Sequence, residues 1–132
     1  MDWPAVFIVF ALSHMVGDFV LQTDWQAEHK HGGLSMGGGE ARRALFSHLL
    51  TYTLTFVPAF IWIGDELGAG TALATVGLIF FPHLLQDDGR LLARYITMVK
   101  GRGAVQVPLV LVAVDQTFHF LVLFGIALLV TA

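Results

Sequence analysis

The hydrophobic positions of this sequence fall into four long apolar stretches, separated by shorter polar connections. Each stretch is close to the roughly 20 apolar residues with which a helix crosses the hydrocarbon core of a bilayer. The sequence therefore predicts a single all-α domain over residues 1–132, a polytopic membrane protein with four transmembrane helices. These helices are expected at about 3–22, 44–64, 71–87 and 107–131.

Three prolines predict where these helices begin or bend. Pro108 suits the first turn of the fourth helix, where a missing N–H group has no cost. Pro58 and Pro82 fall inside the second and third helices. We expect them to kink these helices unless neighbouring groups satisfy the freed carbonyls.

Two connections carry basic residues, and their patterns differ. The connection from Gly89 to about Lys100 sets apolar positions against arginines, which predicts a short interfacial helix on the membrane surface. The other connection contains the glycine-rich loop 32–39, for which we expect no regular structure. We interpret His29 and His31, next to this loop, as solvated surface residues rather than metal ligands.

Composition supports a lipid-facing protein. Of the 132 residues, 56% are hydrophobic and 13% are charged, and the mean hydropathy is +0.74. Soluble domains carry about 25% charged residues, so this chain has too little charge to cover a surface in water. Because cysteine is absent, thiolate metal sites and thiol chemistry are excluded. A net charge of −3 provides no basic field for nucleic acid.

The basic residues predict an orientation. All seven lie in the two connections that follow the first and third helices. The opposite side carries only Asp2, Asp65 and Glu66. The positive-inside rule therefore places both basic loops in the cytoplasm and both chain termini outside.

Histidine and aspartate recur four residues apart within the predicted helices. Residues at this spacing lie one turn apart on one helix face, so each pair presents an imidazole beside a carboxylate. From the expected helix ends, their depths are roughly 2 to 17 Å, in or near the cytoplasmic half. The three pairs and one further histidine are His14 with Asp18, His83 with Asp87, Asp115 with His119, and His48.

Carboxylates inside a membrane need partners, because each costs about 2.5 to 3.5 kcal/mol at a helix centre. We expect no lysine or arginine at their level, which leaves the histidines, protons or a metal ion. Imidazole and carboxylate without thiolate suit zinc, iron or manganese, and seven ligands suffice for a site of one or two metals. The alternative is that each pair is an isolated hydrogen bond or ion pair that only helps to hold the bundle together.

Other polar residues lie near these positions. Gln22 and Gln116 are placed to orient a ligand by hydrogen bonding. Asp18, Asp115 and Tyr52 are the catalytic candidates, a carboxylate as general base and the tyrosine as proton donor. Gly17 is expected to allow a close approach between helices.

These residues together resemble a known family. The segment from His14 to Trp25, with its Gly-Asp-Phe-x-Leu-Gln element, His48, the His83-x-x-x-Asp87 pair and Asp115-Gln116-x-x-His119 are similar to the domain-of-unknown-function family 3307. The resemblance implies a small integral protein of the bacterial inner membrane and supports this choice of site residues, without implying a reaction. The glycine-rich loop and the Gln86-Asp87-Asp88 turn are less typical of the family.

Three functions are compatible with these features. The first is a metal-dependent hydrolase that acts on an amphiphilic substrate near the inner leaflet. The second is transport or sensing of a divalent metal or protons, for which four helices are few, so a homo-oligomer is expected. The third is a non-catalytic accessory or assembly subunit of a larger membrane complex, in which the polar faces supply only contacts. Outside these alternatives the expected partner is the lipid bilayer.

Overall fold

The computed structural model describes residues 1–35 and 38–132, and these residues form helices and turns without a strand. The all-α prediction is thus confirmed. In chain order the elements are α1 (Trp3–Met15), the π-helical segment η1 (Val16–Leu21), α2 (Asp24–His29), α3 (Gly39–Thr55), α4 (Val57–Leu67), α5 (Ala69–Asp87), α6 (Arg90–Lys100), the 3-10 helix η2 (Arg102–Gln106) and α7 (Pro108–Val130).

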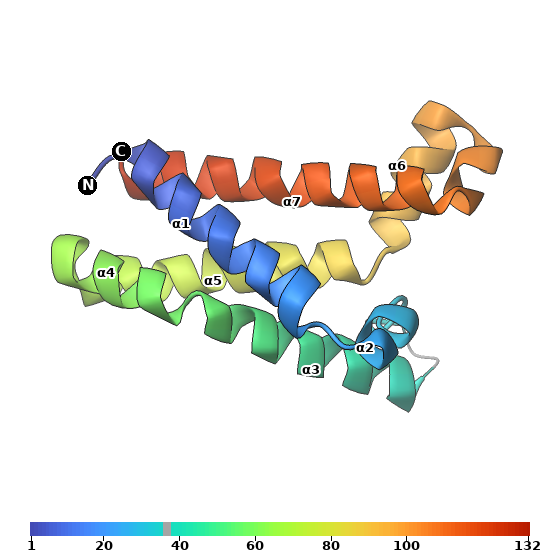
Figure 1. Ribbon diagram of the computed structural model, residues 1–132, viewed down its shortest axis with the longest axis horizontal. Helices are drawn as coiled ribbons and strands as arrows, with labels where there is room; N and C mark the ends of the chain where they lie inside the picture. Colours follow the sequence, from blue (N-terminus) through green and yellow to red (C-terminus); the bar gives the residue numbers. More distant parts are fainter. Residues whose placement is uncertain (36–37) are drawn as a thin grey trace.

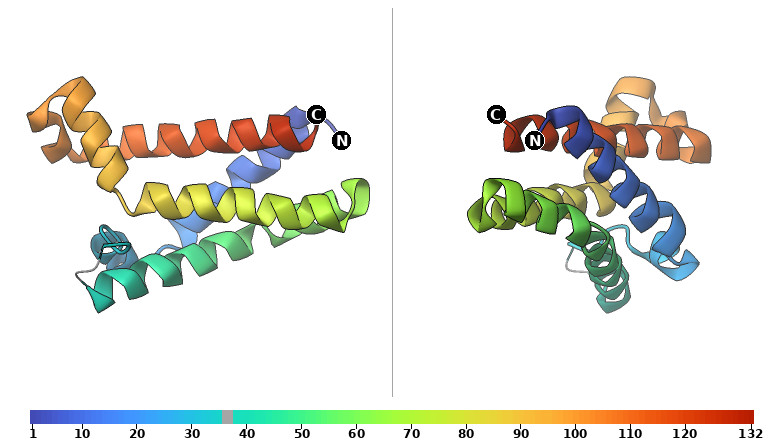
Figure 2. Two further views of the ribbon diagram at one scale, coloured as in Figure 1. Left: turned by 180° about the vertical axis from the view of Figure 1, so that it is seen from behind. Right: turned by 60° about the vertical axis from the view of Figure 1, so that its left-hand side comes forward.

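The long helices run along one axis of an elongated bundle (Figure 1). Helix α5 packs against α3, α4 and α7, and α1 crosses the bundle to contact α7 and α3. Both termini lie at one end beside α4, whereas α2 and α6 lie at the opposite end, as Figure 2 also shows. The two connections that carry the basic residues therefore lie at the same end of the molecule.

Three helical stretches are long and apolar enough to cross a membrane: Trp3–Leu21, Ala69–Asp87 and Pro108–Val130. The second predicted helix is divided into α3 and α4, which meet at Phe56 and are bent by 49°. Pro58 lies in the first turn of α4, so the expected kink occurs as a break. Taken together, α3 and α4 would make a fourth span.

The helix ends differ from the prediction mainly in α3. This helix begins at residue 39 rather than near 44, because Glu40, Ala41 and Arg42 continue the helix toward the glycines. Helices α5 and α7 begin and end within two residues of the predicted limits. Pro82 lies inside α5 and does not end it.

The connection after η1 has more structure than predicted. A capping box opens α2, in which the backbone N–H of Gln26 donates to the Thr23 hydroxyl and the Gln26 side chain accepts from the Thr23 N–H. The chain then turns back toward α5, where the Gly32 N–H donates to the Asp88 carbonyl at 2.8 Å. Residues 36 and 37 of the glycine-rich loop lie outside the described residues. A helix, α6, is present where the interfacial helix was predicted.

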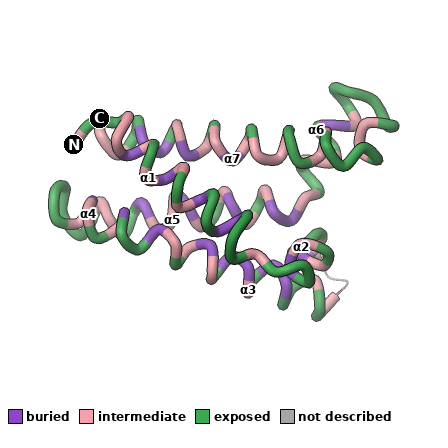
Figure 3. Tube along the Cα trace, viewed as in Figure 1, coloured by how far each residue is buried: buried purple, intermediate pink, exposed green. Residues whose placement is uncertain are grey.

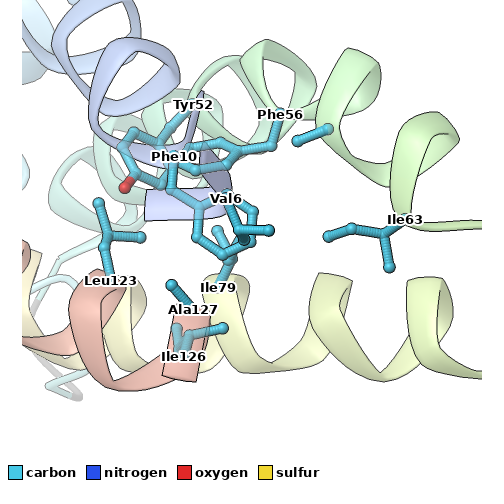
Figure 4. Packing of buried hydrophobic residues seen from close by; sticks show 10 residues of the cluster. Val6, Phe10, Tyr52, Phe56, Ile63, Ile79, Leu123, Ile126 and Ala127 are labelled. Carbon is cyan, nitrogen blue, oxygen red and sulfur yellow. The ribbon is translucent and has the colours of Figure 1, made fainter. Parts of the chain in front are cut away.

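The hydrophobic core fills the end of the bundle that holds the termini. Its buried side chains come from α1, α3, α4, α5 and α7 and include Phe10, Phe56, Ile63, Ile79 and Leu123 (Figure 4). Outward-facing positions are also apolar: Leu73 and Leu109 are 74% and 78% exposed. Figure 3 shows buried positions along the inner faces of the helices and exposed ones outside.

Candidate metal centre

A cluster of buried histidines and aspartates lies between the hydrophobic core and the end that carries α2 and α6. Each of its seven members has a ligand atom within 3.6 Å of another member. The structure therefore brings together every sequence-predicted metal ligand. This His/Asp cluster consists of His14 from α1, Asp18 from η1, His48 from α3, His83 and Asp87 from α5, and Asp115 and His119 from α7.

The pairs predicted from spacing are present within their helices. His83 Nε2 lies 3.1 Å from Asp87 Oδ2, and His14 Nδ1 lies 3.6 Å from Asp18 Oδ2. Asp18 sits in the π-helical segment, whose wider turn changes the direction of its side chain relative to an α-helix. From this position Asp18 Oδ1 approaches His48 Nε2 to 3.3 Å, so the pairs are joined between helices.

A glycine, Gly17, allows η1 and α3 to approach at this level. A Cβ atom on Gly17 would lie 2.6 Å from Tyr52 Cδ2 and 3.3 Å from Tyr52 Cα. Any other residue would therefore force the two helices apart. The Tyr52 ring in turn stacks on His83, with centroids 3.4 Å apart and an interplanar angle of 7°. The expected role of Gly17 in close helix approach is confirmed, and it places Tyr52 against the cluster.

Four ligand atoms form the centre of the cluster. His48 Nε2 and His83 Nε2 are 3.2 Å apart. Asp87 Oδ2 lies 2.9 Å from the first nitrogen and 3.1 Å from the second. On the Asp18 side, Oδ1 lies 3.3 Å and 3.6 Å from the same two nitrogens. Each of the two carboxylate oxygens thus lies 2.9 to 3.6 Å from both imidazole nitrogens.

The α7 side of the cluster is organised by Gln116. Its side-chain oxygen accepts from His14 Nε2 at 2.8 Å, which places a proton on that nitrogen. Its amide nitrogen donates to Asp115 Oδ2 at 3.2 Å and to Asp18 Oδ2 at 3.4 Å. The Tyr52 hydroxyl lies 3.2 Å from His14 Nδ1 and donates to it. Both His14 nitrogens therefore have hydrogen-bond partners in the protein, and Gln116 orients three cluster residues as predicted.

Lys30 is a member of the site that the sequence prediction missed. Its Nζ donates to Asp87 Oδ2 at 2.9 Å and to Gln22 Oε1 at 2.7 Å, and the residue is 7% exposed. The expectation that no lysine reaches this level is wrong, because α2 folds the chain back over the end of α5. Gln22 accordingly holds Lys30 rather than a histidine or an aspartate. The Thr23-x-x-Gln26 capping box was the sequence signal for this turn.

Lys30 changes the charge of the site. Three carboxylates and neutral imidazoles give −3, and the lysine brings the sum to −2. One divalent cation would balance this charge, since −2 and +2 sum to zero. The remaining charge imbalance is buried, because Asp18 and Asp87 are 8% and 2% exposed.

Several buried atoms of the cluster lack a hydrogen-bond partner among the described residues. They include Asp18 Oδ1, Asp87 Oδ1 and His119 Nε2, the last two separated by 3.5 Å. The Nδ1 atoms of His48 and His83 also have none, so these two rings make their polar contacts through Nε2. Buried polar atoms are seldom left unpaired, and a ligand set facing inward is one explanation for them.

An open cleft of about 650 Å³ reaches the cluster from the side of α6. We refer to it as the α6 cleft. It lies between η1, the α2–α3 connection, the start of α6 and the first half of α7, and Asp18, Asp115 and Gln116 form its inner wall. Asp115 is the most accessible carboxylate of the cluster, with a side chain 23% exposed. Small molecules thus have access to the site from one side.

The two histidines predicted to be surface residues lie outside the cluster. His31 is exposed, and His29 packs on Trp25 with its Nε2 3.9 Å from Glu40. Neither belongs to a group of potential metal ligands among the described residues. Four of the six histidines thus lie in the cluster, and His29 and His31 lie apart from it.

Comparison with known proteins identifies a family of unknown function. A search of curated proteins and a search of solved structures each gave no significant match. Residues 6–132 match the family described as "Protein of unknown function (DUF3307)". Because this match covers nearly the whole chain, the protein belongs to the DUF3307 family.

Proposed function

We propose that this protein is a four-span protein of the bacterial inner membrane that binds one divalent metal in its His/Asp cluster and uses it to hydrolyse an amphiphilic substrate. The observation that carries the proposal is that His48 Nε2 and His83 Nε2 lie 3.2 Å apart with a carboxylate oxygen of Asp18 and one of Asp87 close to both. A tetrahedral metal with ligands at about 2.0 to 2.1 Å separates them by about 3.3 Å. The five separations among His48, His83, Asp18 and Asp87 range from 2.9 to 3.6 Å.

Charge supports a single metal rather than two. With Lys30 paired to Asp87, one divalent ion neutralises the cluster, whereas a second would leave a buried excess of +2. Zinc, iron and manganese all accept two imidazoles and two carboxylates. His14 would then orient ligands through Gln116 and Tyr52, since both of its nitrogens are already hydrogen-bonded.

The residues around the cluster fit a hydrolytic role. A bound divalent metal lowers the energy of forming hydroxide from water at neutral pH. Asp115 faces the α6 cleft and accepts a hydrogen bond from Gln116, so it is placed to take the proton of the attacking water and pass it to the leaving group. Tyr52 is a weaker candidate for proton donor because its hydroxyl is directed to His14. Hydrolysis consumes one water, whose hydroxyl joins the electrophilic centre and whose proton leaves with the other product.

The membrane arrangement rests on apolar helices and basic connections. Three spans and the bent pair α3 and α4 provide four crossings. Lys30, Arg42, Arg90 and Arg94 belong to the connections and first turns at the α2 and α6 end. We place this end in the cytoplasm and the termini outside, which sets the cluster toward the inner leaflet.

The alternatives fit the geometry less well. For transport, the cluster would need a polar route in both directions, but toward the termini it meets Phe10, Phe56 and Ile79 of the hydrophobic core. One copy of the chain would then need a second copy to complete a pathway. An accessory subunit needs only contacts between pairs of helices, whereas these residues come together from α1, η1, α3, α5 and α7 and include buried polar atoms that have no hydrogen-bond partner among the described residues.

A hydrolysis assay with chosen variants tests this function. Nitrophenyl decanoate and nitrophenyl decyl phosphate are offered to the reconstituted protein with zinc, manganese or iron(II). We expect metal-dependent turnover that falls at least about 100-fold in Asp115→Asn while bound metal is retained. Asp24→Asn, which changes an exposed acid at the same end, should leave turnover unchanged. Turnover that is insensitive to chelator, or equal in the two variants, would contradict the hydrolytic role.

A further inference from the structure

The α6 cleft combines a basic mouth with an apolar wall. At the mouth lie His31 and Arg90, both exposed, from the α2–α3 connection and the start of α6, and the buried Lys30 lines the cleft beside Asp87. The lining also includes apolar side chains, Phe19 of η1 and Leu111 and Val112 of α7. A cleft of this kind suits a molecule with a polar head and a hydrocarbon chain.

The apolar wall continues onto the outside of the bundle. Phe19 is 54% exposed and Val112 is 50% exposed, so both contribute to the cleft and to the outer surface. These residues belong to η1 and α7, which we assign to membrane spans. An alkyl chain lying along them would therefore pass from the cleft into the bilayer without crossing a polar barrier.

The charges at the mouth favour an anionic head. Asp88 lines this end, but both of its oxygens are engaged: Oδ1 accepts from the Leu34 N–H, and Oδ2 accepts from Arg90 Nε. Arg90 uses only that nitrogen on Asp88, and its side chain is 58% exposed. Its guanidinium thus has further donors in a fork that matches phosphate oxygens.

The inner wall also favours an anion once metal is bound. Asp18 and Asp115 would otherwise repel a phosphate, but a divalent ion in the cluster balances them together with Asp87 and Lys30. Gly89, the N-cap of α6, lies at the same end and has no side chain to cap the helix, so the α6 dipole adds positive potential there. The head would lie between Arg90 and the metal cluster.

We propose that the α6 cleft binds an amphiphile with a phosphate headgroup, its phosphate between Arg90 and the His/Asp cluster and its alkyl chain along Phe19 and Val112. This inference rests on the proposed metal site and names the substrate class of that site. The ligand enters laterally from the inner leaflet, because the apolar wall opens on the surface that faces lipid. Free phosphate lacks the chain and should bind more weakly.

Binding of chain-matched amphiphiles tests the headgroup. The whole chain, loaded with metal in a neutral detergent, is titrated with dodecyl phosphate, dodecyl maltoside and dodecyltrimethylammonium, and native mass spectrometry counts the bound molecules. We expect dodecyl phosphate to bind at least about 10-fold more tightly than the other two and than inorganic phosphate. Equal binding of all three amphiphiles would overturn the proposal, and so would preference for the cationic one. Binding of inorganic phosphate as tight as that of dodecyl phosphate would overturn the role of the chain.

Two matched substitutions on α7 test the location. Val112→Trp fills the apolar wall and should weaken dodecyl phosphate binding at least about 10-fold. Leu109→Trp introduces the same side chain on the same helix, at an exposed position outside the cleft. It should leave binding of dodecyl phosphate within about 2-fold. Equal binding by the two variants would overturn the assignment to this cleft. Because both positions are exposed, neither variant depends on repacking the core.

Metal analysis of the same samples separates this inference from the proposed function. Bound metal without phosphate selectivity would overturn the cleft assignment and leave the metal site standing. Phosphate selectivity in protein that holds no metal would overturn the metal site and show that the basic mouth alone selects the headgroup. A double variant, Asp88→Asn with Arg90→Gln, removes the basic donor without leaving a buried carboxylate unpaired, and should reduce the selectivity about 10-fold.

Discussion

The two halves of this bundle are built on different physical principles. Toward the termini, the helices meet through Phe10, Phe56, Ile63 and Ile79, and shape complementarity holds them together. Toward α2 and α6, the same helices meet through imidazoles, carboxylates and one lysine. In the bilayer proposed for this protein, helices gain little by burying apolar surface from lipid, so close packing would stabilise the first half. The second half carries buried charge and unpaired atoms, features of a site that binds something.

The two halves therefore have different roles, one in stability and the other in binding. The hydrophobic half fixes the relative positions of α1, α5 and α7, which deliver their polar pairs to one level. The polar half then needs no further packing core of its own. Substitutions in the first half should change stability more than metal affinity, and substitutions in the second half should do the reverse.

The largest effect is expected for Asp87→Asn in the polar half. Asp87 contacts His48, His83, His119 and Lys30, so its loss removes a ligand and a full negative charge. We expect metal affinity to fall more than about 100-fold, beyond the 10- to 100-fold typical of losing a residue that only orients a ligand. Isothermal titration calorimetry measures this change. The control Asp65→Asn removes the same charge at an exposed position, and equal affinities in the two variants would contradict the site.

Phe10→Ala tests the hydrophobic half. Phe10 is fully buried and packs against Phe56, with ring centroids 5.9 Å apart. We expect a loss of about 3 kcal/mol in unfolding free energy, at the lower end of the range for soluble cores because lipid replaces water around the separated helices. Unfolding in mixed micelles measures it. Leu12→Ala, on the outer face of the same helix, should cost much less, and the folded fraction of either variant should keep its metal.

Gly17→Ala tests the boundary between the halves. The added methyl group would meet Tyr52 Cδ2 at 2.6 Å, so η1 and α3 must separate. We expect a cost of about 1 to 3 kcal/mol in unfolding free energy. Gly125→Ala in α7 is the matched control, since its Cβ would have no neighbour within 4 Å. If both variants unfold at the same denaturant concentration, the close approach at Gly17 has no energetic importance.

Lys30→Met is expected to have the smallest effect. The direction in which it changes metal affinity is informative. Lys30 Nζ competes with a metal for Asp87 Oδ2, and its charge repels a cation. Its removal should therefore tighten metal binding, by about 10-fold, which corresponds to about 1.4 kcal/mol. Lys30→Arg keeps the charge and should not tighten it. Weaker binding by Lys30→Met would instead show that the lysine is needed to assemble the site.

The sequence predicted the parts of the site that depend on one helix at a time. His14, His83 and His119 lie beside their aspartates because a spacing of four residues places them on one helix face whatever the tertiary structure. Their convergence was inferred from similar depth in the membrane, a constraint that a bilayer supplies and a soluble protein lacks.

The remaining features depend on contacts between distant segments. Lys30 reaches Asp87 only because α2 turns the chain back, and the hydrogen bonds of Gly32 and Leu34 to Asp88 hold that turn. Both nitrogens of His14 are engaged by residues from other helices, Tyr52 and Gln116. Pro58 indicated a kink, but not its angle of 49° or the packing of α4 on α5.

The amount of metal in the purified protein tests the central claim most directly. The protein is purified in a mild detergent without chelator, incubated with zinc, manganese or iron(II), freed of unbound ions and measured by inductively coupled plasma mass spectrometry. We predict one divalent ion per chain, lost in His83→Ala and retained in His29→Ala, which changes a histidine outside the cluster. Less than about 0.1 ion per chain for every metal, or equal content in the two variants, would contradict the account.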